Sequence, residues 1–215
     1  MDIVLNSQNS VAEIFEALPI EETQHMQRVG ALVALFVRRL LKYEFFRKYA
    51  QESGVWGQAA IYHDIGKAWV SAEILTKPGH LTEGERMILC RHPEYAQLFF
   101  ERAQTGGICE FPQHLLQPAR ESALYHHEWW NGKGYPHRLL GPQIPFLSRI
   151  TAVCDAYDAM TSDRVYRRAH SHGCACRELA LHAGEQFDPW LVRAFLHHDA
   201  DFAAAAGEML SLTFE

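Results

Sequence analysis

The chain has 215 residues, of which 48% are hydrophobic and 21% charged, an ordinary globular composition that is sufficient for one sizeable core. Its formal net charge of −6 excludes general nucleic-acid binding, which needs a basic surface, but leaves room for a local cationic pocket. The longest apolar run, residues 29–37, is far shorter than the roughly 20 residues that span a bilayer. With no basic leader segment, the five cysteines are expected to be reduced thiols in a cytoplasm, and Cys174-x-Cys176 alone is a weak indication of a thiolate metal site.

Apolar residues recur at helical spacing and strand patterns are almost absent, which predicts an all-α protein. A short lead, residues 1–18, carries one helix from Ser10 to Leu18. A long amphipathic helix follows Pro19, with a stripe formed by Val29, Leu32, Val33, Phe36, Val37, Leu40 and Leu41. Extended backwards, this stripe reaches His25 and then Glu21, so both are expected on the core-facing side. A histidine there is more often a hydrogen-bonded core residue than a ligand, but the nearby glutamate keeps a metal site open as an alternative.

His63 and Asp64 are neighbours in an otherwise apolar segment that is expected to be a helix from near Val55 to near Gly66, with Lys67 one turn later. Such polar groups are costly to bury unless something pairs them. Imidazole and carboxylate suit a divalent transition metal, and adjacent helical positions diverge by about 100°. His63 could therefore hold one metal while Asp64 reaches towards a second. A buried hydrogen bond between the two, with Lys67 at the surface, is the open alternative.

The middle of the chain carries three further histidines of interest. A capping-box pattern at Thr82 and Glu85 predicts a helix that ends at His92, because Pro93 should kink or restart it. His92 is then either aimed into a cleft or solvated at a helix end. The adjacent pair His126 and His127 repeats the divergent arrangement, and a Gly/Pro-rich loop follows at residues 131–136.

Two more helices are predicted near the C-terminus. Pro145 begins one whose apolar side contains Leu147, Ile150, Cys154, Tyr157 and Thr161 and whose polar stripe contains Thr151, Asp155, Asp158 and Ser162. The two acids need partners, which a metal and a ligand could supply, or a structural network with Arg164, Arg167 or Arg168. Asp188-Pro189 caps a last helix that carries Leu191, Phe195, His198 and Phe202.

Taken in order, these residues resemble the HD-GYP subfamily of the HD phosphohydrolase superfamily over about residues 20–200. The resemblance is carried by the motifs HDIGK at residues 63–67, TKPGHLT at 76–82, RHP at 91–93, HHEWWNGKGYP at 126–136, RITAVCDAYDAMTS at 149–162 and FDP at 187–189. It implies an all-α HD-domain helical bundle with the HD-GYP C-terminal extension, here residues 19–205, between the lead at 1–18 and a tail at 206–215.

The resemblance also implies an activity, the metal-dependent hydrolysis of cyclic di-GMP to linear pGpG and, as in many members of the family, onward to GMP. By position, the metal ligands are Glu21, His25, His63, Asp64, His92, His126, His127 and Asp155. Asp64 would bridge two metals and Lys67 would bind phosphate, which makes both catalytic, and substrate would also contact Tyr135, Asp158, Arg164 and Arg167. Two or three ions are implied, iron first and manganese as the alternative, and Glu21 favours three.

Several positions depart from the family pattern without removing an implied ligand, among them Asn131, Val165, His137 and Arg138. These changes leave two other functions open: a binding or effector module with slow turnover, and a phosphohydrolase acting on another nucleotide. Expected partners are cyclic di-GMP and, through the loop at residues 134–136, a diguanylate cyclase or a response regulator. A homodimer in a bacterial cytoplasm is the expected setting, without DNA, RNA or a membrane span.

Overall fold

A computed structural model describes residues 10–163 and 169–211. Over these ranges the chain forms no named strand, only three isolated bridges, and the all-α prediction is confirmed. The α-helices are α1 (Val11–Glu16), α2 (Ile20–Leu40), α3 (Trp56–Ala60), α4 (Ala72–Leu75), α5 (Glu83–Leu89), α6 (His92–Gln104), α7 (Leu116–Tyr125), α8 (Phe146–Thr161), α9 (His172–Leu181), α10 (Pro189–His197) and α11 (Asp199–Ser211). Short 3-10 helices are η1 (Glu44–Tyr49), η2 (Ser53–Val55), η3 (Ile65–Trp69), η4 (Gln113–Leu115) and η5 (Gly141–Gln143). None of the described helices is long and apolar enough to cross a membrane.

Helix ends lie where the capping residues predict them. Ser10 and Thr82 each form a capping box, with Glu13 and Glu85 respectively, and these boxes begin α1 and α5. Pro93 stands at the second position of α6, where a missing backbone N–H costs nothing, so the helix restarts at His92 as predicted.

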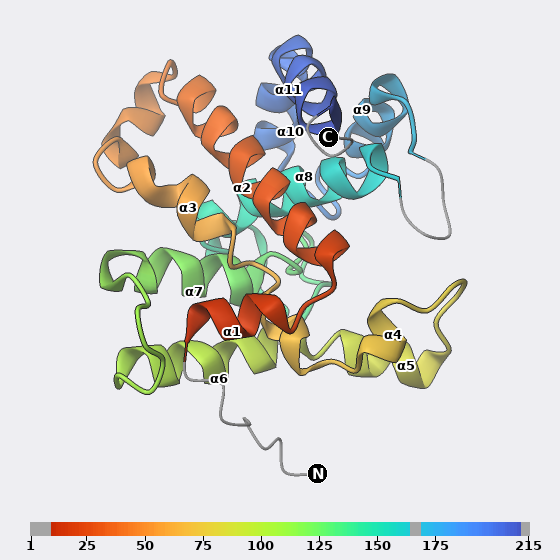
Figure 1. The fold of residues 1–215 in the computed structure, drawn as a ribbon. Helices are drawn as coiled ribbons and strands as arrows, with labels where there is room; N and C mark the ends of the chain where they lie inside the picture. The colour runs from red at the N-terminus through yellow and green to blue at the C-terminus, as the bar shows by residue number, and fades with distance from the viewer. Residues whose placement is uncertain (1–9, 164–168, 212–215) are drawn as a thin grey trace.

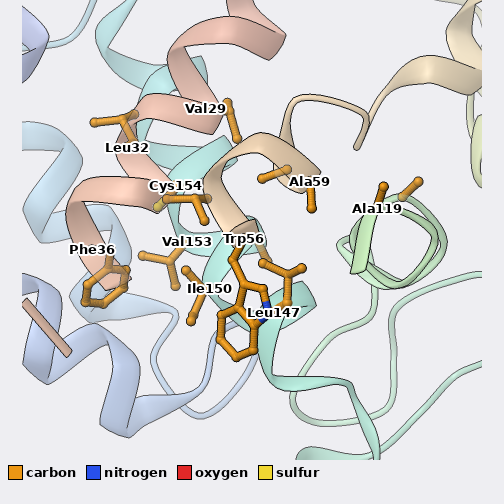
Figure 2. Close-up of a cluster of buried hydrophobic side chains, with 14 of the residues drawn as sticks. Val29, Leu32, Phe36, Trp56, Ala59, Ala119, Leu147, Ile150, Val153 and Cys154 are labelled. Atoms are coloured by element: carbon orange, nitrogen blue, oxygen red, sulfur yellow. The ribbon is translucent and has the colours of Figure 1, made fainter. Parts of the chain in front are cut away.

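Helices α2, α3, α7 and α8 enclose the main core. Figure 2 shows side chains from these helices meeting there: Val29, Leu32 and Phe36 from α2, Trp56 and Ala59 from α3, Ala119 from α7, and Leu147, Ile150, Val153 and Cys154 from α8. Every one of them is buried. Six of the seven residues of the predicted stripe therefore face this core, while Leu41 lies beyond the end of α2 and is half-buried. Helices α6 and α7 lie side by side below the core, and α9, α10 and α11 gather around the C-terminus (Figure 1).

The helix predicted from near Val55 to near Gly66 is wrong in its second half. Helix α3 ends at Ala60, and the backbone then winds tightly, with i→i−3 hydrogen bonds from His63 to Ala60 and from Lys67 to Asp64. In such a 3-10 segment residues three apart eclipse each other. Asp64 and Lys67 therefore lie on the same side, where a regular α-helix would set them about 60° apart.

The C-terminal part also differs from prediction. The predicted last helix is two helices, because α10 ends at His197 and α11 begins at Asp199. The break folds α11 back so that Phe202 stacks on Phe195, with ring centroids 3.9 Å apart. Helix α9 was not predicted, since only Ala175 and Leu179 of its ten residues are buried and give almost no apolar stripe.

Candidate metal centre

Five separate segments bring imidazole and carboxylate groups together beside the core. The residues come from α2 (His25), the turn between α3 and η3 (His63 and Asp64), the start of α6 (His92), the end of α7 (His126 and His127) and α8 (Asp155). They form two sets whose ligand atoms lie within 4.8 Å of one another: Asp64 with His92, His126 and His127, and Asp64 with His25 and His63. Asp64 is common to both.

The protonation pattern of three imidazoles is fixed by the backbone. The Nδ1 atoms of His63, His92 and His126 lie 2.9, 2.8 and 2.9 Å from the carbonyl oxygens of Ala60, Leu89 and Ser122. A carbonyl can only accept, so each Nδ1 carries a proton and donates it. Each Nε2 is then left with a lone pair, as a metal ligand requires.

Those lone pairs have no hydrogen-bond partner in the described structure. The Nε2 atoms of His63, His92 and His126 and Oδ1 of Asp64 are all buried and unsatisfied. Buried polar atoms are rarely left unpaired, because each costs about 1–3 kcal/mol. Three imidazole nitrogens and one carboxylate oxygen that converge without a partner fit the ligand set of divalent transition metals.

Asp64 presents one oxygen to each set. Its Oδ1 lies 3.1 Å from Nε2 of His92 and 3.6 Å from Nε2 of His126, while Oδ2 lies 3.2 Å from Nε2 of His63 and 3.8 Å from Nε2 of His25. Burial alone would raise the pKa of Asp64, but the charge of Lys67 beside it holds that pKa well below its ordinary value. The group therefore stays a carboxylate that could join two metal positions.

The prediction that adjacent residues point to different sites is wrong for His126 and His127, which belong to one set, whereas Asp64 also reaches a set that does not contain His63. His63 and Asp64 approach within 3.2 Å, and the rings of His126 and His127 have centroids only 4.1 Å apart. Both pairs lie beyond the end of a regular α-helix, so the 100° divergence does not apply to them. The two oxygens of Asp64 are what face the two different sets.

His25 is held by two carboxylates of α8. Its Nδ1 is 2.7 Å from Oδ2 of Asp158 and its Nε2 is 3.0 Å from Oδ1 of Asp155. Arg28, one turn along α2, donates two hydrogen bonds of 2.8 and 2.9 Å to Asp158. Arg28 was not among the predicted site residues, although its i, i+3 spacing from His25 could have indicated it. Asp158 therefore orients His25 through this network.

The two carboxylates change the protonation of His25 in the metal-free protein. Burial alone lowers its pKa, but the hydrogen bonds to Asp155 and Asp158 and their charges raise it from 6.5 to about 9. The folded protein thus binds a proton that the unfolded chain releases near pH 6.5. The contribution of this proton to the free energy of unfolding is complete below pH 6.5 and is lost as the pH rises towards 9.

We expect chelator-treated protein to lose up to about 3 kcal/mol of stability between pH 6.5 and 9. Chemical denaturation across that range measures this. Burial lowers the pKa of His127 well below its ordinary value, so protonation of His127 affects stability below pH 6.5 and not between pH 6.5 and 9. The variant His25→Gln should show a flat profile; wild-type stability that stays constant from pH 6.5 to 9 would contradict the role assigned to His25.

Glu21 is exposed, and the prediction that it lies on the core-facing side is wrong. The helix is rotated so that its neighbour Glu22 faces inward, where Oε2 lies 2.8 Å from Nζ of Lys67. The same Nζ is 2.7 Å from Oδ2 of Asp64. Burial lowers the pKa of Lys67, but the charges of Asp64 and Glu22 outweigh it and raise the pKa above its ordinary value, so the ammonium keeps its charge. The prediction that Lys67 is catalytic thus concerns a half-buried cation beside Asp64.

The Gly-Tyr-Pro loop closes over one side of the cluster. Tyr135 stacks on His127, with ring centroids 4.8 Å apart and planes at 22°. Glu128, which the sequence analysis did not single out, is buried and accepts backbone N–H bonds of 2.6 and 2.9 Å from His137 and Leu139. It thereby fixes the loop in place. The predicted substrate residues Arg164 and Arg167 lie outside the described residues.

A cavity of about 290 Å³ opens beside Lys67. Cationic side chains predominate among its polar lining, which includes Lys67, Lys77 and Arg86 along with His80 and Glu22. Lys67 is paired with Asp64 and Glu22, and Lys77 with Glu85, so a phosphate in this cavity would compete with carboxylates for these two cations.

Comparison with known proteins gives consistent matches. The family model described as HD domain matches residues 11–191. A cyclic di-GMP phosphodiesterase of Vibrio cholerae is 40% identical over 154 residues, covering 69% of this chain and 30% of the relative. A 3'3'-cGAMP-specific phosphodiesterase of the same organism is 35% identical over 203 residues, covering 94% of this chain and 35% of the relative. The chain thus spans about a third of the length of these two relatives.

Among solved structures, an HDG"Y"P protein from Bdellovibrio bacteriovorus shares the fold. It superposes with a TM-score of 0.55 at 16% identity, over 79% of this chain and 49% of that chain. The match confirms the predicted helical HD fold.

Proposed function

Because the chain belongs to the HD domain family, we propose that it is a metal-dependent phosphodiesterase that hydrolyses cyclic di-GMP to linear pGpG and onward to GMP. The observation that carries this proposal is the convergence of unpartnered Nε2 atoms of His63, His92 and His126 on the unpartnered Oδ1 of Asp64. The predicted resemblance to the HD-GYP subfamily and the names of the relatives supply the chemistry.

The proposed metal ligands divide between the two sets that Asp64 joins. His92, His126 and His127 with Asp64 would hold one ion, and His25, His63 and Asp155 with Asp64 a second. Divalent ions held there would neutralise the charge of a phosphodiester and lower the pKa of a bound water. The imidazole and carboxylate ligands suit iron, with manganese as the alternative.

The other residues of the centre orient the proposed ligands or stabilise charge on the substrate. Lys67 keeps its charge beside Asp64 and would stabilise the charge that develops on a phosphate oxygen. Tyr135 covers His127 and limits the entry of water, and Asp158 with Arg28 fixes His25 in one orientation. A phosphate of the substrate would occupy the cationic cavity beside Lys67.

Hydrolysis of 3'3'-cGAMP is the second candidate function. It is favoured by the 35% identity to a phosphodiesterase that bears this specificity in its name, close to the identity with the cyclic di-GMP enzyme. The two substrates differ in one base, and the proposed reaction centre contacts phosphate. The bases are therefore expected to decide the preference through side chains around the cavity.

Incubation with both cyclic dinucleotides tests these proposals. The protein would be loaded anaerobically with iron(II) or manganese(II), and the products separated by chromatography. We expect linear pGpG and then GMP from cyclic di-GMP, with loss of activity on chelation. Faster hydrolysis of 3'3'-cGAMP would shift the assignment to the second candidate. Saturable binding without product, in a sample shown to contain metal, would make the chain an effector module.

The number of ions can be tested at Glu21 and Glu22. The resemblance implies Glu21 as the ligand of a third ion, but the structure exposes it and turns Glu22 towards Lys67. We expect Glu21→Gln to leave the metal content unchanged and Glu22→Gln to lower activity about tenfold, because Lys67 loses one of its two carboxylates. Metal analysis and rates of both variants check this; loss of one equivalent in Glu21→Gln would restore the three-metal centre.

We further propose a setting for this activity. The loop at residues 134–136 is flanked by the exposed side chains of Lys133, His137 and Arg138, which supports docking of a diguanylate cyclase or a response regulator there. Five free cysteines without a disulfide fit a reducing bacterial cytoplasm. Homodimer formation remains a prediction that sedimentation can test.

A further inference from the structure

A second group of metal-binding side chains lies outside the proposed centre, between helices α9 and α11. His172 and Cys176 come from α9, and Asp199 is the first residue of α11. Ligand atoms of all three lie within 4.8 Å of one another. Cys176 Sγ is 3.5 Å from Nε2 of His172, and Oδ2 of Asp199 is 3.7 Å from the same nitrogen.

The imidazole of His172 is oriented by the core. Its Nδ1 lies 2.8 Å from the hydroxyl oxygen of Tyr157, a fully buried side chain of α8. In the tautomer in which Nδ1–H donates to that oxygen, Nε2 has a lone pair and is the nitrogen that could bind an ion together with Cys176 and Asp199. Metal-bound histidines are commonly held in this way, with the other ring nitrogen donating to a neighbouring group.

We propose that His172, Cys176 and Asp199 bind a zinc-type divalent ion, separately from the His-rich centre. Thiolate, imidazole and carboxylate are the three ligand types that zinc takes in proteins. Bonds of about 2.3 Å to sulfur and about 2.0 Å to nitrogen at a tetrahedral angle place the two ligand atoms roughly 3.5 Å apart. Cys176 Sγ lies 3.5 Å from Nε2 and 3.8 Å from Nδ1 of His172, so the sulfur is beside the ring and one of the two side chains would turn for both to bind one ion.

Solvent can supply the fourth ligand. The side chains of His172 and Asp199 are 30% and 52% exposed, so an ion can enter from the surface. The spacing of His172 and Cys176 is i, i+4, which puts both on one face of α9. The sequence analysis considered Cys174 with Cys176, but the partner of Cys176 is the histidine one helical turn before it.

The ion would join two helices that have few other links at this point. Asp199 begins α11 directly after the break at His198, and farther along, α11 is held by the ion pair of Asp201 with Arg39 and by the stacking of Phe202 on Phe195. A metal bound to α9 and to the first residue of α11 would fix that break. The proposed role is therefore structural and does not depend on the phosphodiesterase activity.

Cobalt(II) tests this proposal because thiolate bound to cobalt gives a charge-transfer absorption that imidazole and carboxylate ligands do not give. The full chain, reduced and freed of metal, would be titrated with cobalt under anaerobic conditions and then with zinc. We expect the absorption to appear in the wild type, to persist in Asp64→Asn, which lacks the bridging carboxylate of the His-rich centre, and to disappear when zinc displaces cobalt.

Two cysteine variants provide the matched comparison. Cys176→Ser should abolish the absorption and lower the bound zinc by one equivalent, whereas Cys174→Ser, two residues away on the same helix, should retain both. Asp199→Asn, a change at an exposed position, should weaken cobalt binding at least about tenfold. Zinc should raise the thermal midpoint of the wild type and of Cys174→Ser but not that of Cys176→Ser.

Absorption that is absent from the wild type, or that survives Cys176→Ser, would overturn the proposal. Equal loss in both cysteine variants would overturn the assignment of the ligands. In either case His172 would only be hydrogen-bonded to Tyr157, with Cys176 and Asp199 as neighbours that share no ion with it.

Discussion

Replacing Asp64 with asparagine is expected to reduce the hydrolysis of cyclic di-GMP at least about 10³-fold, equivalent to about 4 kcal/mol of transition-state stabilisation. Asp64 is the one carboxylate common to both sets of ligands, and each of its oxygens faces different imidazoles. An amide supplies one weaker oxygen and one N–H donor, so it cannot serve both sets. Initial rates with a saturating metal supply measure the effect.

Metal content and folding have to be measured on the same sample. We expect Asp64→Asn to retain its helical circular dichroism, because Lys67 keeps its ion pair with Glu22, and to bind fewer ions of iron or manganese. Asp201→Asn is the matched control, an aspartate paired with Arg39 on the surface, and should be fully active. Full activity of Asp64→Asn with unchanged metal content would disprove the bridging role.

A methyl group at position 66 is expected to destabilise the protein by about 3 kcal/mol, which lowers the thermal midpoint by roughly 6–12 °C. Gly66 lies in η3 against the first turn of α6, where an added Cβ would collide with the backbone oxygen of His92 and come within 2.7 Å of the backbone nitrogen of Ala96. Backbone atoms cannot move aside as a flexible side chain can. Because His92 is a proposed ligand, the displacement should also reduce activity, on the order of 10²-fold.

Gly84→Ala is the control for Gly66→Ala. Gly84 is exposed in α5, and an added Cβ meets nothing within 4 Å. Alanine there should stabilise the helix by up to about 1 kcal/mol through the better helix propensity alone. If Gly66→Ala proved as stable as the wild type, the tight packing of η3 on α6 would not be what positions His92.

The sequence predicted helix ends well where a side chain forms the end locally. Thr82 with Glu85, Pro93, Pro145 and Asp188 each act within three residues of themselves, so their effect can be predicted without knowing the fold. It predicted the core stripe of α2 for a similar reason, since seven apolar residues at helical spacing leave one face to bury. Helix α9 has no such stripe and was missed.

The residues of the candidate centre could be identified from the sequence, but their arrangement could not. His25, His63, Asp64, His92, His126, His127 and Asp155 were all predicted ligands, and all lie in or beside the two sets. The prediction did not foresee that the backbone tightens after Ala60, which brings His63, Asp64 and Lys67 to one side. That tightening accompanies the packing of Gly66 on α6, which is a contact between segments about 25 residues apart.

The sequence by itself determined the all-α class, the main helix ends and the identity of the imidazole and carboxylate side chains, because these follow from local capping, periodicity and chemical type. Only the tertiary structure decided that Glu22 rather than Glu21 faces inward, that Arg28 holds Asp158, and that Cys176 meets His172 and Asp199. Each depends on how one helix is rotated or placed against another. The packing of the whole core fixes that rotation. A helical period of 3.6 residues does not by itself decide which of two neighbouring residues at the edge of a stripe faces inward.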